Sequence, residues 1–107
     1  MTDIKIKMQF AELVSFSTML HSCIDRSRSI DAIRPIIIAS LVVEKLWESF
    51  VGKIVKRRLK YLISLNEYQA HSLLYLYESG LLRPVEDNMY SKNVLLKIIN
   101  QLHQETL

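Results

Sequence analysis

The sequence predicts a single all-α domain over residues 1–107, a small four-helix domain with one long central helix. Two glycines and two prolines interrupt the chain, which is too few turn residues for a β-rich fold. Apolar residues recur at three- and four-residue steps along most of its length, as on helix faces. The length of 107 residues is typical of one domain, and no linker or repeat divides the chain.

The N-terminal segment, residues 3–10, departs from this helical pattern because its residues alternate strictly. Ile4, Ile6, Met8 and Phe10 are apolar, and the residues between them are Lys5, Lys7 and Gln9. A period of two is typical of a β-strand. No later segment shows a comparable pattern, so the segment is either one short strand that pairs across a dimer or an extended lead-in to the first helix.

The first two helices follow from apolar periodicity. The first is predicted from residue 10 to about residue 24, and the polar run 25–29 is predicted to connect it to the next. The central helix is predicted from Pro35, which is tolerated in a first turn, to Leu62. Gly52 is expected to mark a bend or a close contact in it. Its expected core residues are Ile37, Leu41, Val43, Leu46, Trp47, Phe50 and Ile54.

The predicted central helix is long for the domain. Residues 35–62 would extend ~42 Å as a helix at 1.5 Å per residue. A compact domain of this size has a diameter of ~34 Å. The helix must therefore bend or project, and a projecting amphipathic helix favours a partner.

The last two helices have terminal signals. Ser64 and Glu67 fit a capping box at the start of the third helix, and Gly80 fits the position after its end. The fourth helix is predicted over residues 91–104. It is expected to bury Leu95, Ile98, Ile99 and Leu102.

Half of the residues are hydrophobic, which favours self-association because a short chain has little interior. Together with the long helix and the unpaired strand pattern, this predicts a protein-interaction or assembly module that forms a homodimer through the second half of the central helix. A neighbouring helix of the same chain could instead cover the tyrosines of the third helix. The candidate contact residues are Trp47, Phe50, Tyr68, His71 and Tyr75.

A basic stripe gives the alternative function. Lys53, Lys56, Arg57 and Lys60 share one side of a helix, and the chain has a net charge of +3. Such a row could contact nucleic-acid phosphates, which would make the chain a small nucleic-acid-binding accessory protein. The same cations could equally well contact an anionic membrane surface. A solvated face, with cations near the negative end of the helix dipole, is the simplest interpretation.

No motif predicts catalysis, a metal site or a cofactor, and we expect no enzyme. His21 and Cys23 are two apart on a helix, so their side chains diverge. The longest apolar run, residues 35–43, is about half of the ~20 residues that span a bilayer. We therefore expect no transmembrane segment. One cysteine and no signal-peptide pattern predict a cytoplasmic location.

Overall fold

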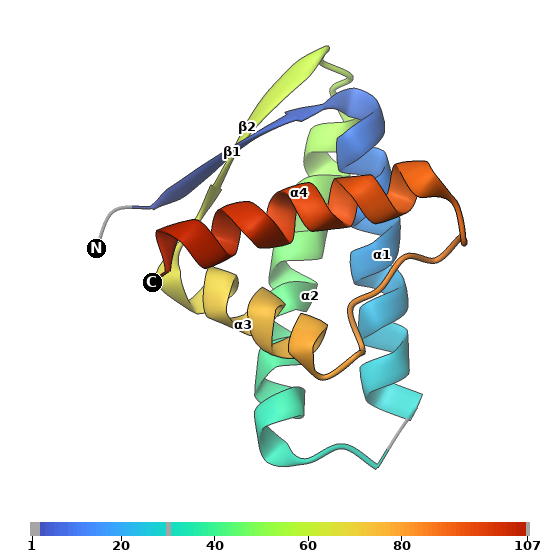
Figure 1. Ribbon diagram of the computed structural model, residues 1–107, viewed down its shortest axis with the longest axis vertical. Helices are drawn as coiled ribbons and strands as arrows, with labels where there is room; N and C mark the ends of the chain where they lie inside the picture. The colour runs from blue at the N-terminus through green and yellow to red at the C-terminus, as the bar shows by residue number, and fades with distance from the viewer. Residues whose placement is uncertain (1–2, 30, 107) are drawn as a thin grey trace.

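The computed structural model describes residues 3–29 and 31–106. The prediction of an all-α class is wrong, because the four helices are accompanied by a two-stranded antiparallel sheet, which makes a largely helical, mixed α/β domain (Figure 1). The elements in chain order are β1 (Ile4–Gln9), α1 (Phe10–Ser29), α2 (Arg34–Val55), β2 (Lys60–Leu65), α3 (Glu67–Glu78) and α4 (Met89–Glu105).

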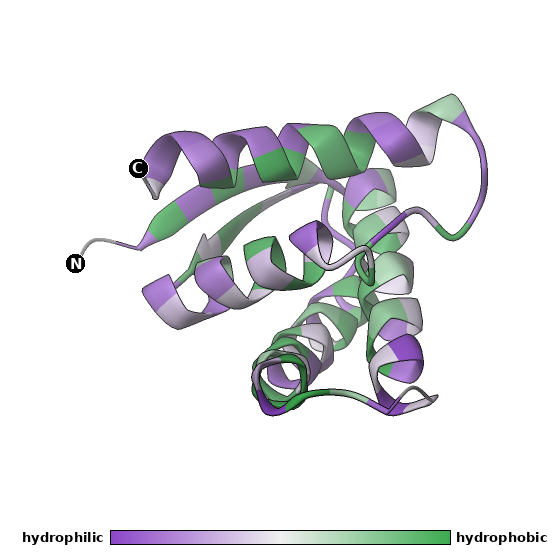
Figure 2. Ribbon diagram, turned by 60° about the horizontal axis from the view of Figure 1, so that its bottom comes forward, coloured by the Kyte–Doolittle hydropathy of each residue, from purple (hydrophilic) through white to green (hydrophobic). Residues whose placement is uncertain are grey.

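The helices enclose one core, which the sheet covers at one end. α1 and α2 lie antiparallel and make the most extensive helix contact, and α3 packs against α2. α4 crosses α1 and lies along the sheet beside β1 (Figure 2). The side chains that meet between these layers are fully buried, and the largest of them include Phe16, Phe50, Ile6, Ile63, Leu73, Leu76 and Ile98.

The alternating N-terminal segment is a strand, and its partner lies within the same chain. β1 pairs with β2 in a register that runs from Ile4 opposite Leu65 to Gln9 opposite Lys60. Every second residue of each strand faces the core. Sequence reasoning missed β2 because exposed Leu62 occupies the outer face, so residues 60–65 read as an apolar run and not as an alternation.

The two outer edges of this sheet differ. Side chains of α4 bond to the edge of β1, with Gln101 Nε2 donating to the Lys5 carbonyl at 2.7 Å and Lys97 Nζ donating to the Lys7 carbonyl at 3.1 Å. These carbonyls therefore point away from β2, so the even-numbered residues of β1 bond to β2. It follows that the backbone groups of Lys60, Leu62 and Ser64 point outward. Among the described residues they have no backbone partner.

α2 ends at Val55, so the prediction of a helix to Leu62 is wrong. Arg57 adopts a left-handed conformation with φ 42°, which turns the chain out of the helix. The Tyr61 hydroxyl accepts a hydrogen bond from the Arg58 N–H at 2.8 Å and donates one to the Lys53 carbonyl at 3.2 Å. A side chain of β2 thus fixes the end of α2, where the local sequence has no glycine or proline to stop it.

The shorter α2 fits within the domain. Its 22 residues extend about 33 Å at 1.5 Å per residue, less than the longest dimension of the molecule, 39 Å. Gly52 lies inside this helix, and a Cβ added there would meet no atom within 4 Å. The glycine therefore marks no close contact.

The predicted core of α2 is correct from Val43 onward. Ile37 and Leu41 are 47% and 58% exposed, so their assignment to the core is wrong. The helix is apolar on all sides from residue 35 to residue 43, while α1 and α3 cover only part of its circumference. The residues that are buried or packed against the core, as predicted, are Val43, Leu46, Trp47, Phe50 and Ile54.

α1 continues to Ser29, through the polar run that we predicted to be a connection. The Ser27 hydroxyl is buried and donates to the Cys23 carbonyl at 2.8 Å. Arg26 Nη1 donates to the Leu81 carbonyl at 3.0 Å, which ties this last turn to the chain after α3. One contact distant in sequence, from Arg26 to Leu81, thus accompanies the extension of the helix.

The capping box of α3 lies two residues later than predicted, because Ser64 belongs to β2. Asn66 Oδ1 accepts from the Gln69 N–H at 2.8 Å, and Gln69 Oε1 accepts from the Asn66 N–H at 3.0 Å. Gly80, with φ 78°, follows the end of α3 as predicted. The residues predicted to be buried in the last helix are all buried: Leu95, Ile98, Ile99 and Leu102.

The register of β2 is testable with two adjacent substitutions. Ile63 is 1% exposed and Leu62 is 55% exposed. We expect Ile63→Ala to lower the free energy of unfolding by about 3 kcal/mol, and Leu62→Ala to change it by less than about 0.5 kcal/mol. Urea unfolding measures both. Equal losses would contradict the strand register.

Candidate interaction surfaces

The five contact residues proposed from the sequence do not form one patch. Phe50 lies in the core, and Trp47 and Tyr75 pack partly buried against it. Tyr68 and His71 are exposed on α3. Helices α1 to α3 thus absorb most of the aromatic surface that the sequence assigned to a partner.

An apolar patch lies instead on the outer side of the first half of α2. It consists of Ile33, Ile37, Ile38 and Leu41, all of them exposed, and we call it the α2 patch. In Figure 2 the segment that leads into α2 and its first turns, at the bottom of the view, carry the green of apolar residues. Sequence reasoning placed this stretch in the core because it is apolar all round. The charged residues Arg34 and Glu48 on the same side of the helix were the signal that this side is exposed.

Opposite charges flank Leu41, the last residue of the α2 patch, at equal distances along the helix. Arg34, Leu41 and Glu48 are spaced seven residues apart, so they fall nearly on one line along the helix. Each charge is about 10.5 Å from Leu41 along the axis. Among the described residues, Arg34 forms no ion pair, and Glu48 is 3.7 Å from Lys45 in a pair that is largely exposed. The row is positive at one end, apolar at its centre and negative at the other end.

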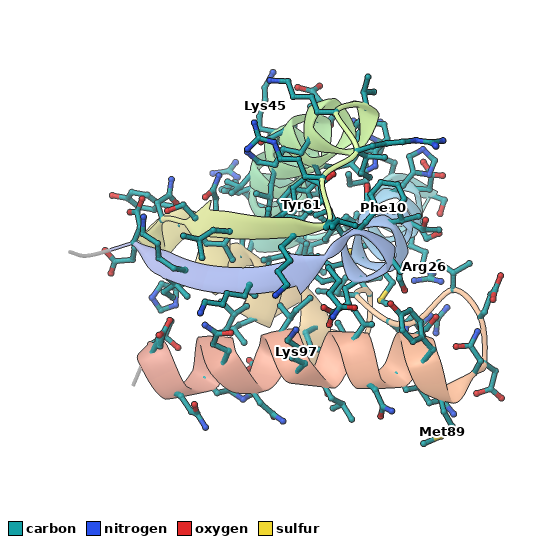
Figure 3. The ribbon with its side chains drawn as sticks, turned by 90° about the horizontal axis from the view of Figure 1, so that it is seen from above. Phe10, Arg26, Lys45, Tyr61, Met89 and Lys97 are labelled. Atoms are coloured by element: carbon teal, nitrogen blue, oxygen red, sulfur yellow. The ribbon has the colours of Figure 1, made fainter. Side chains whose placement is uncertain are left out.

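A second surface, which we call the basic surface, lies at the opposite end of α2. It includes the four cations proposed from the sequence, and it extends over the turn after α2 and the outer face of the sheet, onto which Figure 3 looks. Within the described chain, none of its members forms an ion pair. Its residues are Lys5, Lys7, Lys53, Lys56, Arg57, Arg58 and Lys60.

The basic surface holds the whole positive excess of the protein. The chain has 14 basic and 11 acidic side chains. Seven of the basic ones lie on this surface, together with the carboxylate of Asp3, which is 3.4 Å from the Ser64 hydroxyl on the outer face of the sheet. The remainder of the chain therefore carries seven basic and ten acidic side chains, a net charge of −3. Charge is therefore separated across the molecule, which the overall value of +3 conceals.

Two hollows meet at the start of β2. The smaller, about 260 Å³, has a wall without carboxylates, formed by Lys53, Lys56, Arg58, Lys60, Tyr61 and Leu62. The other, about 510 Å³, includes Glu12. Partial burial raises the pKa of Glu12, but hydrogen bonds from Lys97 at 2.8 Å and the Gln9 N–H at 2.9 Å outweigh it and leave the pKa below its usual value. Lys97 thus balances the negative charge of Glu12, and the positive charges around the smaller hollow have no carboxylate in its wall to balance them.

Aliphatic side chains project among these cations. Leu59 is 89% exposed and Val55 is 79% exposed at the turn after α2, and Leu62 is 55% exposed on the outer face of the sheet. Tyr61, the aromatic residue of this region, is buried. The basic surface therefore combines cations with aliphatic groups.

The residues that could carry chemistry are dispersed. His21 Nδ1 is 3.7 Å from Asp25 Oδ2 on the exposed side of α1, whereas Cys23 is buried on the other side. Among residues 3–29 and 31–106, no group of three or more His, Cys, Asp or Glu side chains could hold a metal ion. None of the helices in those ranges is long and apolar enough to cross a membrane.

The environment of Cys23 predicts an unreactive thiol. Burial raises the pKa of the Cys23 thiol to about 11, so at pH 8 the folded protein holds almost no thiolate. We expect a thiol reagent to label Cys23 at pH 8 only as fast as the protein opens, and rapidly in urea. Labelling of the native protein at the rate of a free thiol would contradict this burial.

Comparisons with known proteins give no relative from which a function could be transferred. No protein-family model matches this chain, and no curated protein or solved structure matches it. Its function is therefore inferred from its own surfaces.

Proposed function

We propose that this chain is an assembly module that forms a symmetric homodimer through the α2 patch. The observation that carries the proposal is the group of four large aliphatic side chains, adjacent to one another on one helix and exposed to solvent. Contiguous apolar surface of this kind is typical of protein contact sites. A two-fold axis lets one face of α2 pack against the same face of a second copy, without a second kind of partner.

The flanking charges favour an antiparallel arrangement of the two α2 helices. A two-fold axis through Leu41, the last residue of the α2 patch, would place Leu41 against Leu41 of the partner subunit and the rest of the patch against residues 44–49 of that subunit's α2. Because Arg34 and Glu48 are equally distant from Leu41, the same axis would place Arg34 beside Glu48 of the partner subunit. Symmetry would form this ion pair twice. A parallel arrangement would place like charges together, which disfavours it.

The proposed interface is centred on Leu41 and extends from Arg34 to Glu48, whereas the sequence favoured the second half of the central helix. Phe50 and Trp47, on the second half, pack toward the core of their own chain and leave little surface for a partner. The first half has the exposed aliphatic groups that a partner would cover. Removal of this area from water would supply the main driving force for association.

A charged residue at position 41, where the proposed axis passes, tests the dimer. The chain has a mass of 12.5 kDa, and we expect light scattering at tens of micromolar to give twice this value. Leu41→Glu should give a monomer, because it would bury two like charges on the axis. Leu96→Glu, which places the same charge at an exposed position of α4, should remain dimeric. A monomeric wild-type protein would refute the proposal.

Exchange of the flanking charges tests the antiparallel geometry. Arg34→Glu and Glu48→Arg should each weaken the dimer roughly tenfold, since two pairs are lost at about 0.5–1 kcal/mol each. The double variant should restore the affinity. Within one chain these residues are about 21 Å apart along the helix, so only a contact between subunits can produce the rescue. Sedimentation equilibrium measures all three constants; a double variant as weak as the sum of its parts would exclude this arrangement.

A further inference from the structure

The corner between α2 and β2 forms one tip of the molecule, at the top of Figure 1, and it is held in place by two sets of contacts. The Leu59 carbonyl accepts a hydrogen bond from the Phe10 N–H at 3.3 Å. The Tyr61 hydroxyl bonds to both sides of the turn after α2. These contacts hold the backbone of Leu59 in place while its side chain stays 89% exposed. Leu59 is therefore an aliphatic group that is held in place, exposed to solvent and available for contact with a partner.

We propose that the basic surface docks on an anionic lipid bilayer, with Leu59 and Val55 entering the headgroup region. Interfacial binding elements combine Lys and Arg with projecting aliphatic groups, the two components found here. The cations would face the lipid phosphates and carboxylates, and the aliphatic groups would leave water. No part of the chain needs to cross the bilayer for such binding.

The charge distribution supports this orientation. The seven cations and one carboxylate, that of Asp3, lie on the surface that would face the membrane, and the remainder of the chain carries a net charge of −3. An anionic leaflet therefore attracts one side of the molecule and repels the other. Each Lys or Arg near such a leaflet strengthens binding about fivefold.

The exposed aliphatic groups favour a lipid surface over nucleic acid. Phosphate contacts by Lys and Arg would explain the cations equally well, but a phosphate backbone offers no apolar site for Leu59 or Val55. Binding to single strands typically adds exposed aromatic groups on which bases stack, and Tyr61 is buried. Lipid binding makes use of both components of the surface.

Flotation with lipid vesicles tests the proposal. We expect wild-type protein to float with vesicles of phosphatidylcholine and phosphatidylserine but not with phosphatidylcholine alone, and added salt should weaken the binding. Leu59→Asn should bind roughly tenfold more weakly, because it removes one apolar side chain from the contact. The matched control, Leu96→Asn on α4, should bind like wild type. Both positions are exposed, so neither change should prevent folding.

A charge-matched pair of variants tests the electrostatic component. Replacement of Lys56, Arg58 and Lys60 by Gln should weaken vesicle binding about a hundredfold, at about fivefold per cation. The control replaces Lys45, Arg83 and Lys92 by Gln, which gives the same net charge with the basic surface intact. It should bind like wild type. Equal losses in the two variants would show attraction by net charge alone and overturn the proposal.

The remaining outcomes also decide the question. No flotation with phosphatidylserine vesicles at low salt would overturn the proposal. The proposal would also be overturned if wild type and Leu59→Asn bound vesicles with equal affinity and both retarded duplex nucleic acid in a gel with equal affinity. Leu41→Glu, which tests the dimer, lies at the other end of α2 and should still bind vesicles. Failure of the dimer and failure of lipid binding are therefore distinguishable.

Discussion

The pairing of β1 with β2 is the interaction on which the rest of the structure depends. A two-stranded sheet alone is marginally stable in water, and here the buried faces of both strands close the core formed by the helices. The pairing sets Tyr61 opposite Met8 and brings its hydroxyl to the last turn of α2. It thereby determines where α2 ends, how the chain turns at residues 56–59, and which residues the outer face of the sheet presents. The basic surface exists because residues 56–60 leave the helix.

The two proposed surfaces lie at opposite ends of α2 and have different physical origins. The α2 patch is apolar because α1 and α3 cover only part of the helix, while the basic surface is charged because the turn and the sheet gather cations from three elements. In an antiparallel dimer the two basic surfaces would point in opposite directions.

The sequence predicts those parts of the fold that depend on local periodicity. The alternation at residues 3–10, the position of Gly80 after α3 and the buried face of α4 can all be recognised from neighbouring residues. The predicted fold class was wrong because β2 carries Leu62 on its outer face, which hides the alternation of apolar and polar residues in this strand. The predicted end of the central helix was wrong because hydrogen bonds of the Tyr61 hydroxyl, a tertiary contact, fix where α2 ends. The cations Lys53 to Lys60 were identifiable by spacing, but Lys5 and Lys7 join them only through the strand register.

Amide hydrogen exchange over residues 56–65, measured by NMR, tests the β1–β2 pairing most directly. In an antiparallel pair with one free edge, backbone N–H groups alternate between bonded and solvent-facing. We expect slow exchange at Tyr61, Ile63 and Leu65, and fast exchange at Lys60, Leu62 and Ser64. Uniform protection from residue 56 to residue 62 would indicate that α2 continues as a helix. That result would contradict the sheet, the end of α2 and the basic surface together.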